Sequence, residues 1–304
     1  MYLLYIIVIF LLGFVAPVQT SINSEASRYI GSPVGASLYS FLSGTVALLI
    51  IVLIAGHGLA FPSSPIQGLP WWAWLGGAAG VLGITVNILL LPRLGSIHTV
   101  IMPLVGQVTA GFVIDAFGLF DTDVRPFSLF RAIGFILIIA GVFFAVVRKG
   151  ASSYPKNALG WQLLGIVAGA ALAMQPAMNS RLGTALDSPL RASLFSFASG
   201  AVLLLLIMAL SGTHRPYIGK VVTAGRPAWD WLGGLIGVCI VIGQTYLVSY
   251  IGVGLLTILN IFGMLASGAL IDHFGLLNVE KRPVTGRKLL GLTLVLAGII
   301  ILNV

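Results

Sequence analysis

Four carboxamide side chains in apolar surroundings are the residues of this sequence best suited to bind a small molecule. Gln19 and Asn23 are four residues apart, and so are Gln175 and Asn179. This spacing places each pair on one face of a helix. Polar groups inside an apolar span require partners. The amides therefore either line a cleft and bind substrate, or hydrogen-bond neighbouring helices at about 1 kcal/mol per contact, and both interpretations stay open.

Three further amides lie in apolar segments that are rich in small residues. Asn87 and Gln244 continue helical faces that also carry glycines, and we interpret those glycines as sites where neighbouring backbones pack closely. The glycines of each face form a groove, and the two amides are predicted to face a cavity at its floor. Gln107 is a third candidate for substrate binding, although the position that matches it in the second half of the chain is Met264.

Glu25 and Arg181 form the first of two pairs of charged residues that could control access to such a site. They occupy matching positions in the two halves of the chain, so an acid stands where the other half has a base. A gating salt bridge is one interpretation, and two solvated loop charges are the other.

Asp115 and Asp272 form the second pair, each at the end of a predicted helix just before Phe-Gly. A helix-capping role, or an ion pair with a nearby base such as Arg125 or Arg282, is favoured over a role in transport.

No pattern typical of an enzyme, a metal site or a nucleotide-driven pump occurs in the sequence. There is no HExxH, GxSxG or Walker A motif, and the four histidines are scattered. Cys239 is the single cysteine, which excludes an intramolecular disulfide, and we expect it to be buried. We therefore predict no catalytic residue, metal or cofactor.

The elements that position these residues are predicted to be membrane-spanning helices. Charged residues make up 8% of the chain and hydrophobic ones 58%, with a mean hydropathy of +1.08, whereas a soluble domain has roughly a quarter charged residues. Ten apolar segments are each close to the length of about 20 residues that a span needs. They lie near 1–20, 35–56, 71–91, 98–118, 131–148, 160–180, 190–211, 229–250, 254–274 and 288–304.

The net charge is +8, and the Lys and Arg residues lie almost wholly between these segments or at their ends. In these places they indicate membrane topology and not nucleic-acid binding. Ten spans place both termini on one side, together with four Lys and Arg residues, and leave the other 12 on the opposite side. By the positive-inside rule the termini lie outside.

An internal repeat organises the ten segments. At an offset of 156 residues Gln19 matches Gln175 and Asn23 matches Asn179, and at an offset of 157 the Trp-Leu-Gly-Gly run at 74–77 matches 231–234. The halves are 1–150 and 157–304, with five spans each. Because five is odd, the second half enters the membrane from the opposite side, so the repeats are inverted. Inverted repeats allow two packings around a midplane site, each open to one side.

Each half resembles the YdcZ-type domain of the drug/metabolite transporter superfamily, which is related to EamA-type exporters. The resemblance covers nearly the whole chain. It rests on the Gln-x3-Asn pairs, the Ser-Pro at 32–33 and 188–189, the Ser-Phe-x-Ser-Gly stretches and the Asp-x-Phe-Gly ends. It implies export of small metabolites across the bacterial inner membrane, and the wider superfamily suggests termini inside, against the charge argument. The first helix lacks the glutamate with which small multidrug exporters couple proton transport.

The sequence thus predicts an all-α integral protein of the inner membrane that acts as a secondary transporter, an exporter of a small metabolite or drug-like molecule. The alternative is a non-transporting accessory or scaffold protein. The expected partners are the lipid bilayer and a small-molecule substrate, with a homodimer left open.

Overall fold

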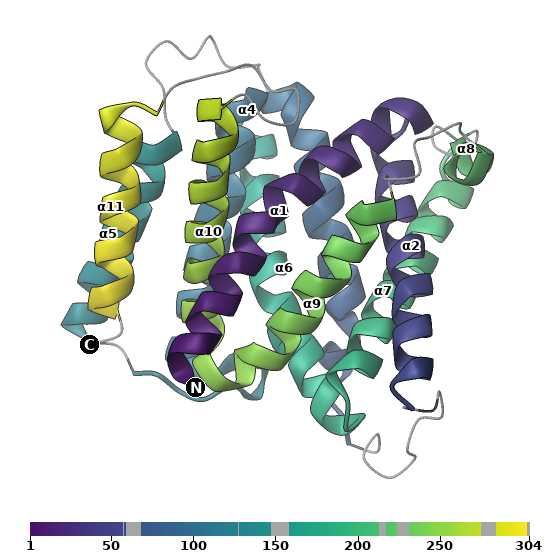
Figure 1. The fold of residues 1–304 in the computed structure, drawn as a ribbon, viewed down its shortest axis with the longest axis horizontal. Helices are drawn as coiled ribbons and strands as arrows, with labels where there is room; N and C mark the ends of the chain where they lie inside the picture. The colour runs from purple at the N-terminus through teal and green to yellow at the C-terminus, as the bar shows by residue number, and fades with distance from the viewer. Residues whose placement is uncertain are drawn as a thin grey trace.

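The computed structural model of this protein consists of helices in every regular element that it describes (Figure 1). It describes residues 1–56, 58, 68–126, 128–146, 158–212, 217–223, 231–274 and 284–302. The α-helices are α1 (Tyr2–Ile30), α2 (Pro33–Ile54), α4 (Gly76–Phe117), α5 (Leu129–Val146), α6 (Ala158–Ala185), α7 (Pro189–Leu210), α8 (Ile218–Thr223), α9 (Trp231–Ile251), α10 (Val253–Phe274) and α11 (Gly286–Leu302). Two short 3-10 helices, η1 (Trp71–Leu75) and η2 (Leu119–Asp121), flank α4.

Six of the described helices, α1, α2, α6, α7, α9 and α10, are long and apolar enough to cross a membrane. Two shorter apolar stretches, Met102–Phe117 and Leu129–Ala145, lie in α4 and α5. Large apolar side chains cover the outside of these helices, as at Ile54 and Leu210, which are 82% and 86% exposed. Such a surface is stable only against lipid, so the protein is a multi-pass membrane protein. Cys239, which we expected to be buried, is exposed on this surface.

The repeated Ser-Pro motif starts a helix in each half. Gly31 ends α1 with a left-handed backbone, φ 80°, and Ser32 then accepts a hydrogen bond from the backbone N–H of Gly35 at 3.2 Å. Ser188 accepts the equivalent bond from Arg191 at 3.3 Å. Serine is a favoured N-cap and proline is favoured at the first helical position. The motif therefore has a structural role, and it brings the chain back after a short turn.

Helix α4 takes the place of two separate expected segments, 71–91 and 98–118. Its 42 residues would extend about 63 Å if straight, about twice the thickness of the hydrocarbon core. Instead it doubles back along α6. Gly76 at its start lies against Asn179, whereas Leu90 and Met102 both lie beside Gly165. Phe120, just after its end, again lies near Arg181. The two ends of α4 therefore lie near the same end of α6.

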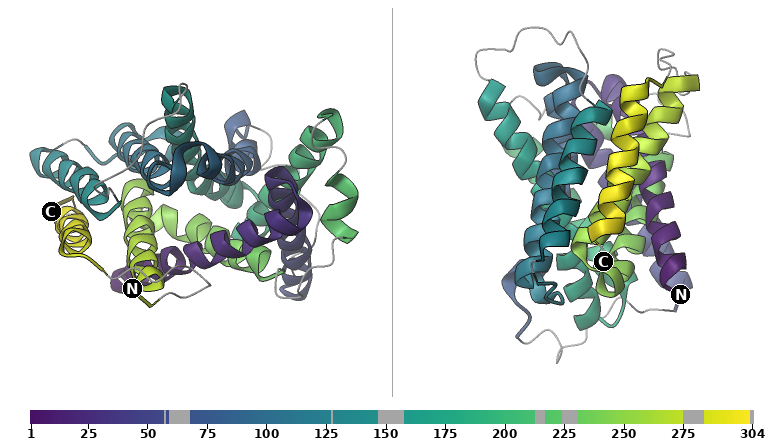
Figure 2. Two further views of the ribbon diagram at one scale, coloured as in Figure 1. Left: turned by 90° about the horizontal axis from the view of Figure 1, so that it is seen from above. Right: turned by 90° about the vertical axis from the view of Figure 1, so that its left-hand side faces the viewer.

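The two halves pack against each other reciprocally. Helix α1 of the first half packs on α9 and α10 of the second half. Its counterpart in the second half, α6, packs on α4, which holds the first-half positions equivalent to α9 and α10. Viewed from above, α4 and α6 form one row of helices and α1, α9 and α10 form another (Figure 2). The pair α5 and α11 lies at one end of the molecule, and α2 packs on α7 at the other (Figure 1).

Matched glycines permit this close approach. A Cβ atom on Gly106 would collide with the backbone carbonyl of Ile166, and one on Gly263 would collide with that of Phe10. Gly77 likewise lies against the backbone at Ser196, and Gly234 lies against that at Ser40 and Gly44 in the other half. Small residues at helix contacts let backbones come close in a membrane. These backbone contacts are made by other glycines than those on the Asn87 and Gln244 faces. There, Gly76, Gly80, Gly83, Gly233 and Gly237 lie against side chains, among them those of Asn179, Gln175 and Gln19, so the predicted close approach of backbones at these positions is wrong.

Candidate functional site

A cavity of about 140 Å³ lies between the two rows of helices. Helices α1, α2, α4, α6, α7, α9 and α10 all contribute to its wall. Its described lining residues are Ala16, Gln19, Thr20, Phe41, Ile84, Asn87, Gln107, Leu172, Gln175, Phe197, Gly237, Ile240, Val241, Gln244, Leu256, Thr257, Asn260 and Met264. Both halves of the chain therefore form the cavity.

Five of the predicted binding residues line this cavity, namely Gln19, Asn87, Gln107, Gln175 and Gln244. Each comes from a helix that packs across the repeat boundary. The Nε2 atoms of Gln19 and Gln175 also lie near Gly237 and Gly80, at 2.5 and 2.7 Å from the point that a Cβ atom would occupy. These glycines therefore leave the room in which the two glutamine side chains lie.

Asn23 and Asn179 are not among the residues that line the cavity. Each lies one helical turn beyond its glutamine. Asn23 is 5% exposed and Asn179 is 0% exposed. Asn23 packs against Gly233, and Asn179 packs against Gly76. Neither amide atom of Asn179 has a hydrogen-bond partner among the residues that the structure describes. The structure thus separates the glutamines from the asparagines, which the helical spacing had placed on one face.

Helix α10 supplies four lining residues that sequence analysis did not propose as binding residues, Leu256, Thr257, Asn260 and Met264. Thr257, Asn260 and Met264 follow one another at spacings of three and four, which places them on one face. The Nε2 of Gln244 donates to the Oδ1 of Asn260 at 3.1 Å. Asn260 was missed because its counterpart in the first half is Pro103, so comparison of the halves drew no attention to it. The available signal was its spacing of four residues from Met264, the counterpart of Gln107, because this spacing places the two on one helical face.

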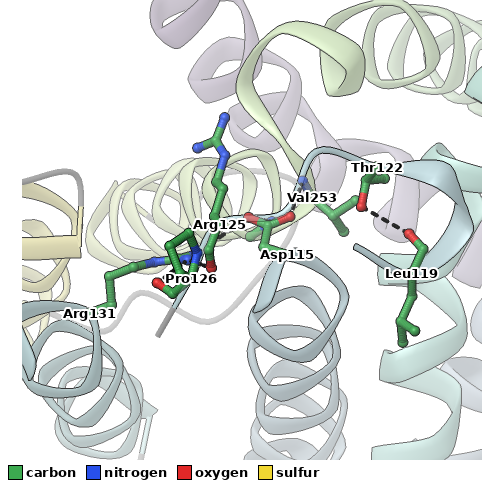
Figure 3. Close-up of polar contacts among 8 residues, drawn as sticks. Asp115, Leu119, Thr122, Arg125, Pro126, Arg131 and Val253 are labelled. Atoms are coloured by element: carbon green, nitrogen blue, oxygen red, sulfur yellow. Dashed lines mark hydrogen bonds and ion pairs between the residues drawn. The ribbon is translucent and has the colours of Figure 1, made fainter. Parts of the chain in front are cut away.

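Asp115 lies away from the cavity lining and holds three elements together (Figure 3). Its carboxylate accepts hydrogen bonds from the first two backbone N–H groups of α10, Val253 at 2.9 Å and Gly254 at 3.0 Å. The Nη2 of Arg131, on α5, lies 3.8 Å from Oδ2. Asp115 therefore caps the partner helix from the other repeat, and a carboxylate at a helix N-terminus is favourable.

Arg125, the base proposed to pair with Asp115, contacts it through the backbone. The N–H of Arg125 donates to the carbonyl oxygen of Asp115 at 2.7 Å, while its guanidinium points away from the carboxylate (Figure 3). Arg131 in turn donates to the carbonyl oxygens of Arg125 and Pro126. The side-chain ion pair of Asp115 is therefore with Arg131, while the charge of Arg125 also attracts this carboxylate, as predicted. The side chain of Asp272 and all of Arg282 lie outside the described residues.

Arg181 forms an ion pair at one end of α6. Its Nε donates to Oδ2 of Asp121 at 2.9 Å, and both residues line a second pocket of about 200 Å³. Within the part of the chain that the structure describes, Glu25 is not a partner of Arg181. Asp121 and its neighbour Phe120 both have positive φ angles, 58° and 62°, which are unusual for residues with a Cβ. The backbone at this turn thus adopts an uncommon conformation where Asp121 meets Arg181.

Comparison with known proteins gives a family for this arrangement. The family described as "Putative inner membrane exporter, YdcZ" matches the chain twice, over residues 4–144 and 160–301. The chain belongs to the YdcZ family. The two matches confirm both the resemblance to YdcZ-type domains and the tandem repeat, and they place this protein in the inner membrane.

The fold of this YdcZ-family chain also occurs in a solved structure. A crystal structure that shares 16% sequence identity superposes with a TM-score of 0.63, over 96% of this chain and 95% of the other. At this identity the likeness concerns the fold alone. No curated protein matches the chain in sequence. The YdcZ match therefore gives the class of function, export, and leaves the substrate to be inferred from the cavity.

Proposed function

We propose that this protein is a secondary transporter that exports a small molecule by alternating access. Its two inverted five-helix repeats, residues 1–150 and 157–304, would rock about the cavity that they share. The single observation that carries the proposal is that equivalent residues of the two repeats, Gln19 and Gln175, line one cavity. A site on the axis between inverted repeats stays in place while the packing around it opens to either side.

Ten crossings are consistent with the described helices. The two legs of α4 join α1, α2 and α5 to make five crossings for the first repeat, and α6, α7, α9, α10 and α11 make five for the second. The start of α1 and the end of α11 lie at the same end of the bundle, as an even number requires (Figure 1). Five crossings in each repeat support the inverted arrangement.

The Arg181–Asp121 pair is our candidate for a gate at one end of the path. Alternating access requires one side of the cavity to be closed while the other is open. Positions 25 and 278, which correspond to Arg181 and Asp121, hold Glu and Asn, so the sequence offers no equivalent pair in the other repeat. We therefore propose a charged gate at only one of the two ends.

The alternative is a non-transporting accessory or scaffold protein, which would bury its amides fully paired in a solid core. The cavity argues against that alternative. The buried Oδ1 of Asn87, a residue of the cavity lining, has no hydrogen-bond partner within the described part of the chain. A polar atom left unpaired in this way has a cost that a bound ligand would remove.

The test is a metabolite-efflux and resistance screen of expressing cells, followed by transport into everted membrane vesicles. The variant Q19A/Q175A should lose the flux that the unaltered protein supports. C239S is the matched control, because Cys239 lies exposed on the outer surface. If folded protein moved no compound in either direction, the transporter proposal would be wrong.

A further inference from the structure

The cavity has a chemical character that narrows its substrate. None of its eighteen described lining residues carries an ionisable acid or base. The polar ones are six carboxamides and two threonines, and the remainder are apolar or glycine. The lining is thus polar without being charged.

An ion in this position would lack a countercharge. Transfer of an unpaired ion from water to a low-dielectric interior is far more costly than transfer of a neutral polar group that finds hydrogen bonds. The buried acid closest in sequence to the cavity, Asp115, is fully engaged by two N–H groups of α10 and by Arg131. The wall therefore favours uncharged molecules over both cations and anions.

Carboxamides offer donors and acceptors at the same site. Each NH2 donates twice and each C=O accepts, so a ligand with both kinds of group can satisfy them. Asn87 presents a buried acceptor, Oδ1, for which the described residues provide no donor, whereas the Nε2 of Gln244 already donates to Asn260. A ligand would need a hydrogen-bond donor to satisfy Asn87.

Size and apolar surface complete the description. A cavity of about 150 Å³ holds one benzene molecule, and this cavity has about 140 Å³. Phe41 and Phe197 line it with their rings in contact, at 5.3 Å between centroids. The site thus accommodates a molecule of about one ring, with one apolar face.

We infer that the substrate is an uncharged molecule of about single-ring size that carries both hydrogen-bond donors and acceptors. The inference rests on the proposed transport function, and it adds the class of substrate. It also predicts that Gln107, the amide whose counterpart in the other repeat is Met264, keeps the lining uncharged at its position. A carboxylate at position 107 would supply the missing countercharge for a cation.

The experiment compares binding of matched triplets of single-ring compounds to the purified full-length protein in detergent. Each triplet has an uncharged amide, the corresponding carboxylate and a form made cationic by methylation of a ring nitrogen, for example nicotinamide, nicotinate and 1-methylnicotinamide, a pyridinium cation. Saturable shifts in thermal stability give the affinities. Uncharged members should bind about tenfold or more tightly than both of their charged analogues. Gln107→Glu should reverse the preference between amide and cation, and Gln107→Met, the matched uncharged control, should not.

Two results would overturn the inference, and they are distinguishable. If charged members bind as tightly as uncharged ones and are transported in liposomes, the substrate class is wrong and the transport function stands. If no member of a broad set of triplets binds, and efflux screening finds no flux, both the substrate class and the proposed function are wrong.

Discussion

Phe41 and Phe197 occupy the same position in the two repeats, and their rings touch each other at 5.3 Å between centroids with an interplanar angle of 42°. Two equivalent residues can contact each other only near the axis that relates them. The approximate two-fold axis of the molecule therefore passes beside this ring pair. Because both rings line the cavity, the candidate binding site lies on the axis, where each repeat contributes equivalent residues.

Gln175 and Asn179 should differ sharply when replaced by alanine, although they lie one turn apart on α6. Gln175→Ala removes an amide from the cavity wall, so vesicle transport should fall about tenfold or more. Asn179→Ala removes an amide that does not line the cavity, so transport should change less than threefold, by about 0.6 kcal/mol. Equal losses in both variants, at equal levels of folded protein, would contradict the separation of the two amides.

Gly234→Ala should destabilise the protein. A Cβ atom there would collide with the Ser43 side chain and lie 2.8 Å from the backbone N of Gly44, and overpacking of this kind costs about 1–3 kcal/mol. Gly268→Ala is the matched control, since no atom of the described residues lies within 4 Å of its Cβ position and alanine favours the helix by up to about 1 kcal/mol. Thermal unfolding in detergent should show a lower midpoint for the first variant only.

Asp115→Ala should destabilise the junction of α4, α5 and α10. The variant loses two hydrogen bonds to the start of α10 and leaves Arg131, only 8% exposed, without its carboxylate. Loss of a cap costs about 0.5–2 kcal/mol, and the unpaired arginine adds to this. Asp123→Ala, at an exposed acid, is the control. A midpoint of unfolding unchanged by Asp115→Ala would exclude the tethering role.

Reversal of charge at Arg181 and Asp121 tests the gate. The pair is partly exposed, with side chains 34% and 61% accessible, and exposed ion pairs contribute about 0–1 kcal/mol to stability. Arg181→Asp should therefore lower vesicle transport with little change in thermal unfolding. Asp121→Arg should lower transport too, and it should also lower the midpoint of unfolding, because arginine tolerates the positive φ at this position less well than aspartate. The exchanged double variant should recover at least part of the transport. Failure of the double variant to exceed both single variants would remove the gating role.

Much of the fold followed from the sequence, because membrane insertion and duplication leave signals that need no knowledge of contacts. The apolar segments predicted spanning helices, and matched Gln, Asn, Trp and Gly residues predicted the tandem repeat that the YdcZ matches confirm. The Ser-Pro pairs at 32–33 and 188–189 marked helix starts, since capping depends on residues that are close in sequence. These features are local or repeat-wide, so residue types and spacing alone determine them.

Tertiary structure decided which side chains meet. Helical spacing placed Gln175 and Asn179 on one face. In the folded protein Gln175 lines the cavity, whereas Asn179 packs against Gly76 and is not part of the lining. The choice of Arg131 over Arg125 as the ion-pair partner of Asp115 depends on how α5 meets α10. Asn260 reaches Gln244 because of the rotation of α10 about its own axis against α9. Such relations depend on helix rotation and on packing between segments far apart in the chain, which the 3.6-residue period does not encode.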